Sequence, residues 1–510
     1  MSATSHPHGS GKPGVEVNPF GTPIDRPWLD DLETSTDFWN RTPQLQRIAW
    51  LALEKDVSPW GLLMGVQLHR LSHIKPTVVL VQRDGTPDTL GGLFGGTSLN
   101  MFGGLTADSG GGKSVTFKLA SSIMPPVHTP IADGTGQGLI KSIAETEKVS
   151  MEDGQKLAEP YYVTRFNRHS LVVHAPEIKT LNAEFAREAS KTDSMMRSMW
   201  SGETVGMTTG DRDRRVTLPA NMYRIVGMWG VQPVNATAIL AGADDGTPQR
   251  WLWAPGEEFR DGIVRANPGH VDFPFPVFGQ VGGNPFGVSG GEPPTEFRDG
   301  DALPSPTWVH WSPKMMTEVK AMQSARKALR NRDPYADLTE AQRDAEKAVT
   351  MQSHLTLTRI KLACLLGFLW GHANPTDDDW DLAGVQLQVS MRELAGIWKV
   401  ANEARKNEII VKGRERGLEM HAAQGARDTL GDNAVEAFAS EIWRMLCVDG
   451  PMTNRDLRKW AGGNARQKMV SWAIQVLEDD NRCTKDRNNM YWGLWDSKPA
   501  PAEKAHTYVP

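Results

Sequence analysis

The 510-residue chain has very few cysteines: Cys364, Cys447 and Cys483 lie far apart and form no Cys-x-x-Cys pair. An odd number of widely spaced cysteines excludes a disulfide framework and a cysteine-based zinc site, and it is typical of a reducing compartment. The chain also lacks any apolar run of about 18 residues, and its first residues lack the apolar stretch of a secretion signal. We therefore expect a soluble, cytoplasmic protein with no membrane partner.

The chain has little excess charge of either sign. Its 56 Lys and Arg residues stand against 61 Asp and Glu residues, which gives a net charge of −5. This balance excludes a generally basic surface, so any contact with DNA must come from local clusters. The length allows roughly two to four domains, and the ordinary apolar content indicates that most of the chain is folded.

The rest of the chain is organised around residues 99–124. There a short apolar run leads into a glycine-rich loop, and a helical pattern follows and stops at two prolines. This order predicts a phosphate-binding loop, because glycines let several backbone N–H groups face one anion and the helix directs its positive dipole end there. The predicted ATP-binding residues are Ala107, Asp108, Ser109, Gly110, Gly111, Gly112, Lys113 and Ser114.

Within this loop, Lys113 is the predicted partner of the β- and γ-phosphates, and the Ser114 hydroxyl is the predicted Mg²⁺ ligand. Ala107 occupies the position where the usual pattern begins with glycine, so the pattern is a relaxed form of the motif. The strand pattern before the loop and the helical pattern after it favour phosphate binding over chance.

Two later apolar runs end in polar residues and predict neighbouring strands of a parallel sheet. Residues 170–177 end in Pro176 and Glu177, and residues 223–233 contain Gln232 near their end. ATPases with a phosphate loop place a Glu that orients water, and an Asp that reaches Mg²⁺, after such a strand. Glu177 is the predicted catalytic carboxylate, although a solvated strand-end residue is the alternative. Pro176 replaces the Asp, so either the loop and phosphates hold Mg²⁺ unaided or another carboxylate contributes.

Arginines mark two further candidate sites. Arg250 follows a turn and precedes an aromatic strand, which predicts an arginine finger that acts across a subunit boundary if it lies at the edge of the domain. Residues 200–219 predict a charged hairpin, and it either holds DNA phosphates or forms a solvated turn. The arginines of this hairpin are Arg212, Arg214 and Arg215.

Five segments between residues 37 and 384 carry a resemblance to a known family. They read DFWNRTPQLQRIAWLALEKDVSPWGLL, SLNMFGGLTADSGGGKS, MWSGE, YRIVGMWGVQP and DGTPQRWLWAP. In this order they resemble an uncharacterised family of P-loop ATPases encoded by actinobacterial phages, prophages and mobile elements. That family is similar to the helicase half of phage and plasmid primase-helicases, and so to superfamily-3 and AAA+ ring motors.

The resemblance implies an ATPase that uses ATP and Mg²⁺ and assembles as a homo-oligomeric ring. It gives catalytic roles to Lys113, Glu177, Gln232 and Arg250, with Gln232 sensing the γ-phosphate. In AAA+ relatives a lid helix also brings an arginine to the γ-phosphate, and Arg359 is the candidate for that role here.

Composition and periodicity predict the domain layout. The predicted parts are a disordered tail (1–27), a helical N-terminal module (28–95), a P-loop ATPase core (96–255), a Pro- and Gly-rich irregular excursion (256–313), a helical lid region (314–431), a winged helix-turn-helix (432–497) and a second tail (498–510). The helical region is expected to end near Met420, before a polar break. Residues 377–379, three aspartates, are predicted to open a helix rather than to hold a metal.

Three helices and two short strands in residues 433–495 predict the winged helix. Its predicted DNA-binding residues are Arg466 and Lys468 on the third helix and Lys485 and Arg487 in the wing. Acidic residues 478–480 nearly balance these charges, so a protein-docking role is equally open.

The sequence thus predicts an α/β protein with a P-loop NTPase core of the AAA+ or superfamily-3 type. The favoured function is an ATP-dependent DNA motor, or replicative helicase, of a phage or mobile element. One alternative is an ATP-controlled DNA-binding replication initiator or regulator with little unwinding. Another is an ATPase of phage packaging or interference.

Overall fold

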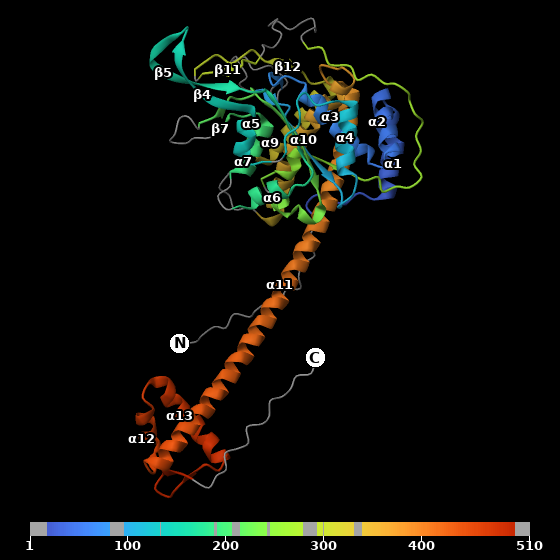
Figure 1. The fold of residues 1–510 in the computed structure, drawn as a ribbon. Helices are drawn as coiled ribbons and strands as arrows, with labels where there is room; N and C mark the ends of the chain where they lie inside the picture. Colours follow the sequence, from blue (N-terminus) through green and yellow to red (C-terminus); the bar gives the residue numbers. More distant parts are fainter. Residues whose placement is uncertain are drawn as a thin grey trace. The chain divides into compact units, whose positions relative to one another are not determined.

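The computed structural model describes residues 18–81, 96–132, 134–187, 191–206, 215–241, 245–278, 293–298, 300–330 and 339–494. The chain divides into two compact units, Met1–Arg405 and Lys406–Pro510. The first unit is a mixed α/β structure built around a parallel sheet (Figure 1). None of the helices in the described ranges combines the length and the apolarity that crossing a lipid bilayer requires.

A four-stranded parallel sheet, ordered β10-β3-β9-β6, forms the centre of the first unit. Its strands are β3 (Met101–Thr106), β6 (Ser170–Ala175), β9 (Arg224–Val231) and β10 (Trp251–Pro255). Ile131 adds a single parallel bridge to Val173. β3 and β9 are buried along their whole length, as expected for strands covered on both faces. The predicted parallel strands, and the adjacency of β6 and β9, are confirmed.

Helices surround this sheet, and α3 packs directly on its strands. The helices of the first unit in the described ranges are α1 (Arg26–Thr36), α2 (Pro43–Glu54), α3 (Pro59–Ser72), α4 (Lys113–Ile123), α5 (Gly136–Ile143), α6 (Lys179–Ala186), α7 (Thr192–Ser201), α8 (Thr237–Ala241), α9 (Pro313–Arg330), α10 (Glu340–Leu369) and the first part of α11 (Asp377–Val448). Every residue of α3 is buried, and this helix packs against α4, α10 and β9. The N-terminal helices therefore share one apolar core with the sheet.

The start of α11 explains the three consecutive aspartates. The Thr376 N–H donates to the Asp379 carboxylate (2.8 Å), and the Asp379 N–H donates to the Thr376 hydroxyl (3.2 Å), which is a reciprocal cap. Asp377 accepts the backbone N–H of Lys314, and Asp378 forms an ion pair with Arg41. The three carboxylates thus have separate partners, and no metal-binding group of acidic, His or Cys side chains occurs within the described ranges. The predicted helix-opening role is confirmed.

Three smaller sheets complete the first unit. Their orders are β12 (Thr307–Val309)-β1 (Val78–Leu80)-β2 (Thr97–Ser98), β11 (Glu296–Phe297)-β5 (Gln155–Phe166)-β4 (Ala144–Glu152), and β7 (Val205–Gly206)-β8 (Thr217–Leu218). The β4–β5 hairpin extends away from the rest of the unit and is largely exposed (Figure 1). β7 and β8 form the arms of the predicted charged hairpin. Of its arginines, Arg212 and Arg214 lie outside the described residues.

The second unit contains the end of α11 and a small α/β arrangement. Its elements are β13 (Met452–Thr453), α12 (Asn454–Ala461), α13 (Asn464–Asp479), β14 (Cys483–Lys485) and β15 (Met490–Gly493), with strand order β13-β15-β14. Phe438, Leu457 and Leu477 belong to a core of its own. The predicted helices and strands of this part are confirmed.

One boundary prediction near the second unit is wrong. α11 continues without interruption from Asp377 to Val448, so the break expected after Met420 is absent. Residues 402–432 are rich in Glu, Lys, Arg and Ala, which favour helix, and contain no proline. Each glycine in this stretch costs only about 1 kcal/mol, which the surrounding residues offset.

All three cysteines are free. Burial raises the pKa of the Cys364 and Cys447 thiols above its ordinary value, and raises that of Cys483 to about 11. The three thiols are therefore protonated at neutral pH.

Candidate functional site

The glycine loop connects the carboxyl end of β3 to the amino end of α4. Gly110 and Gly112 have φ values of 90° and 69°, a left-handed conformation that glycine adopts without steric cost. The Gly111 N–H donates to the Asp108 carbonyl (3.1 Å), which closes a tight turn. The predicted order of strand, loop and helix is confirmed, and residues 108–110 are exposed at the rim of the loop.

Lys113 lies under this loop with its side chain largely buried. Its Nζ donates to the carbonyl oxygens of Ala107 (2.7 Å) and Asp108 (2.6 Å). Burial lowers the pKa of Lys113 from its ordinary value, and the charges of Glu177, Glu257 and Asp108 act in the opposite direction. The ammonium group therefore feels the charge of these carboxylates, and it can transfer its two hydrogen bonds to an incoming anion.

Glu177 and Gln232 meet beside the loop. Glu177 lies two residues beyond β6 and Gln232 one residue beyond β9, and the Gln232 Nε2 donates to the Glu177 Oε1 (3.3 Å). Asn235 donates to the Gln232 Oε1 (2.9 Å), and Lys179 Nζ lies 3.1 Å from the Glu177 Oε2. These contacts orient the two side chains at the carboxyl edge of the sheet, where Lys113 also lies.

Glu257 is a third carboxylate at the loop, and the sequence analysis missed it. It lies two residues beyond β10, and a Cβ placed on Gly111 would overlap its carboxylate. The backbone before it is fixed: the Gly256 N–H donates to the Thr106 carbonyl (2.7 Å), and the Ser58 N–H donates to the Gly256 carbonyl (3.1 Å). The signal that could have found Glu257 is its position after an apolar strand, which it shares with Glu177 and Gln232.

An ionic cluster anchors the segment that follows Glu257. The buried Arg260 forms ion pairs with Glu258 (2.9 Å), Glu33 (3.1 Å) and Asp30 (3.0 Å). Burial by itself would lower the pKa of Arg260, but its hydrogen bonds to Glu258 and Glu33 outweigh burial and raise it.

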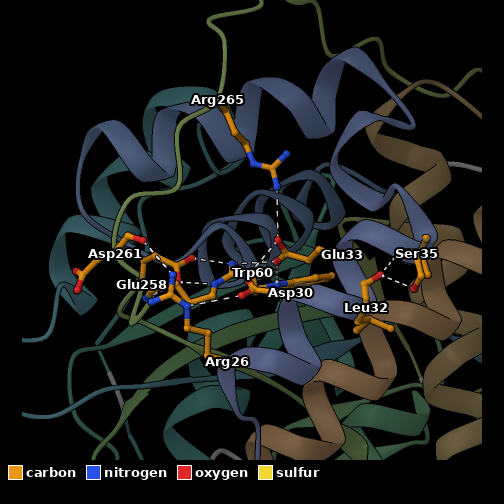
Figure 2. Close-up of polar contacts among 11 residues, drawn as sticks. Arg26, Asp30, Leu32, Glu33, Ser35, Trp60, Glu258, Asp261 and Arg265 are labelled. Carbon is orange, nitrogen blue, oxygen red and sulfur yellow. Dashed lines mark hydrogen bonds and ion pairs between the residues drawn. The ribbon is translucent and has the colours of Figure 1, made fainter.

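The same cluster extends to α3. Figure 2 shows that Glu33 also accepts the Trp60 indole N–H (2.8 Å) and contacts Arg265 (3.4 Å). The chain after β10 is therefore tied to α1 and α3 by buried groups whose charges compensate one another.

Arg250 lies apart from the loop within one chain. It ends the short helix η4 (Pro248–Arg250) at the amino end of β10, whereas the loop follows the carboxyl end of the parallel strand β3. Its Nη1 donates to the Asp245 carbonyl (2.8 Å), and burial lowers its pKa. β10 pairs only with β3 in the described sheet, so Arg250 lies at a sheet edge.

Arg359 also lies apart from the loop. Its guanidinium stacks over Trp380 (3.7 Å) and lies 3.3 Å from Glu318 Oε2. The adjacent Thr358 donates to the Gln249 carbonyl, and Lys361 donates to the Asn100 carbonyl. Both carbonyls precede strands of the central sheet, so this part of α10 contacts the end of the sheet opposite the loop. Its proposed role at a γ-phosphate remains a prediction.

The predicted DNA-binding residues of the second unit differ in their surroundings. Arg466 forms an ion pair with Glu441 and lies over the Phe438 ring (4.7 Å). Lys468 is exposed on α13, and Lys485 and Arg487 are exposed on and after β14. In the first unit, Arg215 is exposed and its carbonyl accepts a hydrogen bond from Thr146.

The sequence matches no known family model and no curated protein. The function must therefore be inferred from the geometry of the chain itself.

Proposed function

We propose that residues 107–114 bind the phosphates of ATP and that Glu177 and Gln232 support its hydrolysis. The observation that carries this proposal is the meeting of the loop, Lys113, Glu177 and Gln232 at one edge of the parallel sheet. A glycine loop at a helix N-terminus with a lysine beneath it is suited to a polyphosphate.

The strand order supports a P-loop NTPase core. β9 separates the loop strand β3 from β6, which carries Glu177. Two strand spacings amount to about 10 Å, which leaves room for a terminal phosphate and an attacking water between the loop and the carboxylate. In this arrangement Glu177 orients the water, and Gln232 holds Glu177 while it contacts the phosphate.

The donor atoms at the loop fit Mg²⁺. Ser114 is exposed on the first turn of α4, and the charge of Glu177 acts on the adjacent Lys113, so both residues offer hard oxygen donors to the cation. When bound, the cation would polarise the phosphates and neutralise part of their charge. Lys113 would then exchange its two carbonyl partners for phosphate oxygens.

We further propose that the chain is an ATP-dependent DNA motor that works as a homo-oligomeric ring. The position of Arg250 at the edge strand β10 favours a role at the site of a neighbouring subunit. The β7–β8 hairpin with Arg215, and the cations of the second unit, are the proposed DNA contacts. The three free thiols favour a cytoplasmic location.

A second candidate function is an ATP-controlled DNA-binding initiator with little unwinding. Pro176 favours it, because this residue occupies the position of the expected metal-associated carboxylate after β6. The winged-helix-like order of helices and strands in the second unit would then supply the DNA contact.

ATP hydrolysis measured for wild type, Lys113→Ala and Arg250→Ala tests these proposals. The reactions contain either no DNA, single-stranded DNA or forked DNA, and the protein concentration is varied. We expect turnover to rise with DNA and with protein concentration, to vanish in each variant alone, and to return when the two variants are mixed. Such recovery shows that one subunit completes the site of the next.

Two results would contradict parts of this proposal. If wild type binds ATP but turnover stays negligible under all conditions, the motor is wrong and the initiator is the better account. If Lys113→Ala binds ATP as wild type does, the loop is not the phosphate site.

A further inference from the structure

Glu257 touches the loop, yet the proposed hydrolysis gives it no role. Its carboxylate occupies the space that a Cβ on Gly111 would need, and its charge acts on Lys113. Within the described part of the chain, Glu257 forms no hydrogen bond or ion pair. An exposed carboxylate without a partner therefore lies at the surface where the proposed function places phosphates.

We propose that Glu257 makes nucleotide binding at the loop depend on a divalent cation, so that the site takes Mg²⁺-bound ATP and rejects the metal-free nucleotide. This inference rests on the proposed phosphate-binding function of the loop.

The fold holds Glu257 in this position. The preceding residue, Gly256, donates a hydrogen bond to the Thr106 carbonyl. The following residue, Glu258, forms an ion pair with the buried Arg260. The anchoring of Gly256 and Glu258 fixes the backbone on both sides of Glu257, and the Glu257 carboxylate lies against Gly111 of the loop. The backbone of Glu257 therefore cannot move away from the loop without breaking the contacts of its two neighbours.

The charge of Glu257 opposes a bare polyphosphate. Two like charges about 5 Å apart, in surroundings intermediate between water and protein interior, repel by an amount equivalent to about a tenfold loss of affinity. A cation bound between the carboxylate and the phosphates reverses the sign of this interaction. Glu257 follows β10 and would thus supply a carboxylate from that side of the loop. On the β6 side, Pro176 occupies the position where a second carboxylate was expected.

The test compares binding of a fluorescent ATP analogue, measured by anisotropy, in Mg²⁺ and in EDTA. The proteins are wild type, Glu257→Gln, Asp261→Asn and Lys113→Ala, all full-length. Asp261→Asn removes the same charge from the same segment at an exposed residue, and so controls for net charge. Thermal unfolding of each variant checks that it is folded.

We expect Glu257→Gln to tighten binding in EDTA by about fivefold to tenfold, with no such gain in Mg²⁺. The ratio of the two dissociation constants should therefore fall, whereas Asp261→Asn should keep the wild-type ratio. An unchanged ratio in Glu257→Gln, or an equal change in both conditions, overturns the role of Glu257. Binding by Lys113→Ala at wild-type strength would instead overturn the proposed function, so the two failures are distinguishable.

Discussion

Arg224 is fully buried on β9, and no carboxylate in the described ranges pairs with it. Its guanidinium donates to the carbonyls of Ile74, Lys75 and Val78 and to the side chains of Ser98 and Asn100. Burial lowers its pKa to about 9, but the five acceptors satisfy every donor of the fork. Carbonyl dipoles therefore stabilise this charge and join the segments around β1 and β2 to the central sheet.

A histidine pair lies beneath the candidate site. The Nε2 atoms of His69 on α3 and His174 on β6 are 2.7 Å apart, and His69 Nδ1 lies 2.8 Å from the Met124 carbonyl. Since a carbonyl can only accept, His69 carries its proton on Nδ1 and accepts at Nε2 from His174. The Phe117 ring of α4 stacks on His174 (5.1 Å), so the pair links the loop helix to the strand that precedes Glu177.

This pair predicts a loss of stability in mild acid. Burial lowers the pKa of both histidines to about 4, so the unfolded chain binds protons more readily than the folded chain between pH 6.5 and 4. The stabilisation is complete above pH 6.5 and is lost as the pH falls towards 4, by up to about 3 kcal/mol per histidine. In urea unfolding at pH 5, 6 and 7, His174→Asn should reduce the fall in unfolding free energy between pH 7 and pH 5.

The control for this series is His270→Asn, because the His270 side chain is 89% exposed. It should keep the wild-type pH dependence. Glu393 acts in the opposite direction, since burial raises its pKa to about 7 and its stabilisation declines as the pH rises from 4.5. The contribution of Glu393 is the same in wild type, His174→Asn and His270→Asn. Equal pH dependence of the unfolding free energy in wild type and His174→Asn would therefore contradict the role of the histidine pair.

At the scale of elements, β3 and β9 depend on glycine for close packing against tryptophan. A Cβ on Gly104 would overlap the Trp253 ring, and a Cβ on Gly227 would overlap the Trp229 ring. Trp251 lies between these two rings, with centroids 4.8 Å from Trp229 and 5.6 Å from Trp253. The packing of these rings against β3 and β9 therefore leaves no space for a methyl group at Gly104 or Gly227.

Gly104→Ala should therefore destabilise the first unit by about 1–3 kcal/mol through overpacking. Gly138→Ala on α5 is the matched control, because a Cβ there meets only the Thr135 hydroxyl at 3.4 Å. Since alanine favours helix, the control should be neutral or stabilising by up to about 1 kcal/mol. Chemical unfolding measures both variants, and equal effects would contradict this packing argument.

Most elements could be predicted from the sequence, because their apolar spacing matches the strand or helix period. The β4–β5 hairpin could not, since its strands are largely exposed and polar, as in the segment AETEKVSME, and show no apolar alternation. The continuity of α11 was missed for a related reason. Residues 405–420 of this helix are all exposed, so no apolar period marks that stretch as helix.

The candidate site could be predicted in part. The loop, Glu177 and Gln232 each follow an apolar run that predicts a buried strand, and the structure brings them together. Glu257 follows the apolar strand β10, but its closeness to the loop also depends on β10 lying next to β3, which the local pattern alone does not give. Arg250 was expected to act across a subunit boundary and Arg359 to reach the γ-phosphate from a lid helix. Within one chain, both lie at the end of the sheet opposite the loop.

At the scale of the whole molecule, each of the two units has its own hydrophobic core. Two large apolar clusters lie in the first unit, and a third is confined to the second unit. Residues 405–420 of α11, at the division between the units, are all exposed. A helix without packed neighbours transmits little stabilisation, so each core should melt according to its own contacts.

Calorimetry of the full chain should therefore show two unfolding transitions. Leu477→Ala removes a fully buried side chain from the second unit, and Leu171→Ala does so from β6 in the first. Each change should cost about 2–5 kcal/mol and lower the midpoint of one transition only. A single transition that shifts in both variants would show that the units unfold together.

The burial of Cys364 and Cys483, and the partial burial of Cys447, make this chain suitable for site-specific labelling. Maleimide dyes react with thiolates, which are scarce at neutral pH in all three native cysteines. A cysteine introduced at an exposed position, such as Asp261 beside the ionic cluster, would thus react with the dye in preference to the buried Cys364 and Cys483. Fluorescence from that position could then follow the segment after β10 when a nucleotide is added.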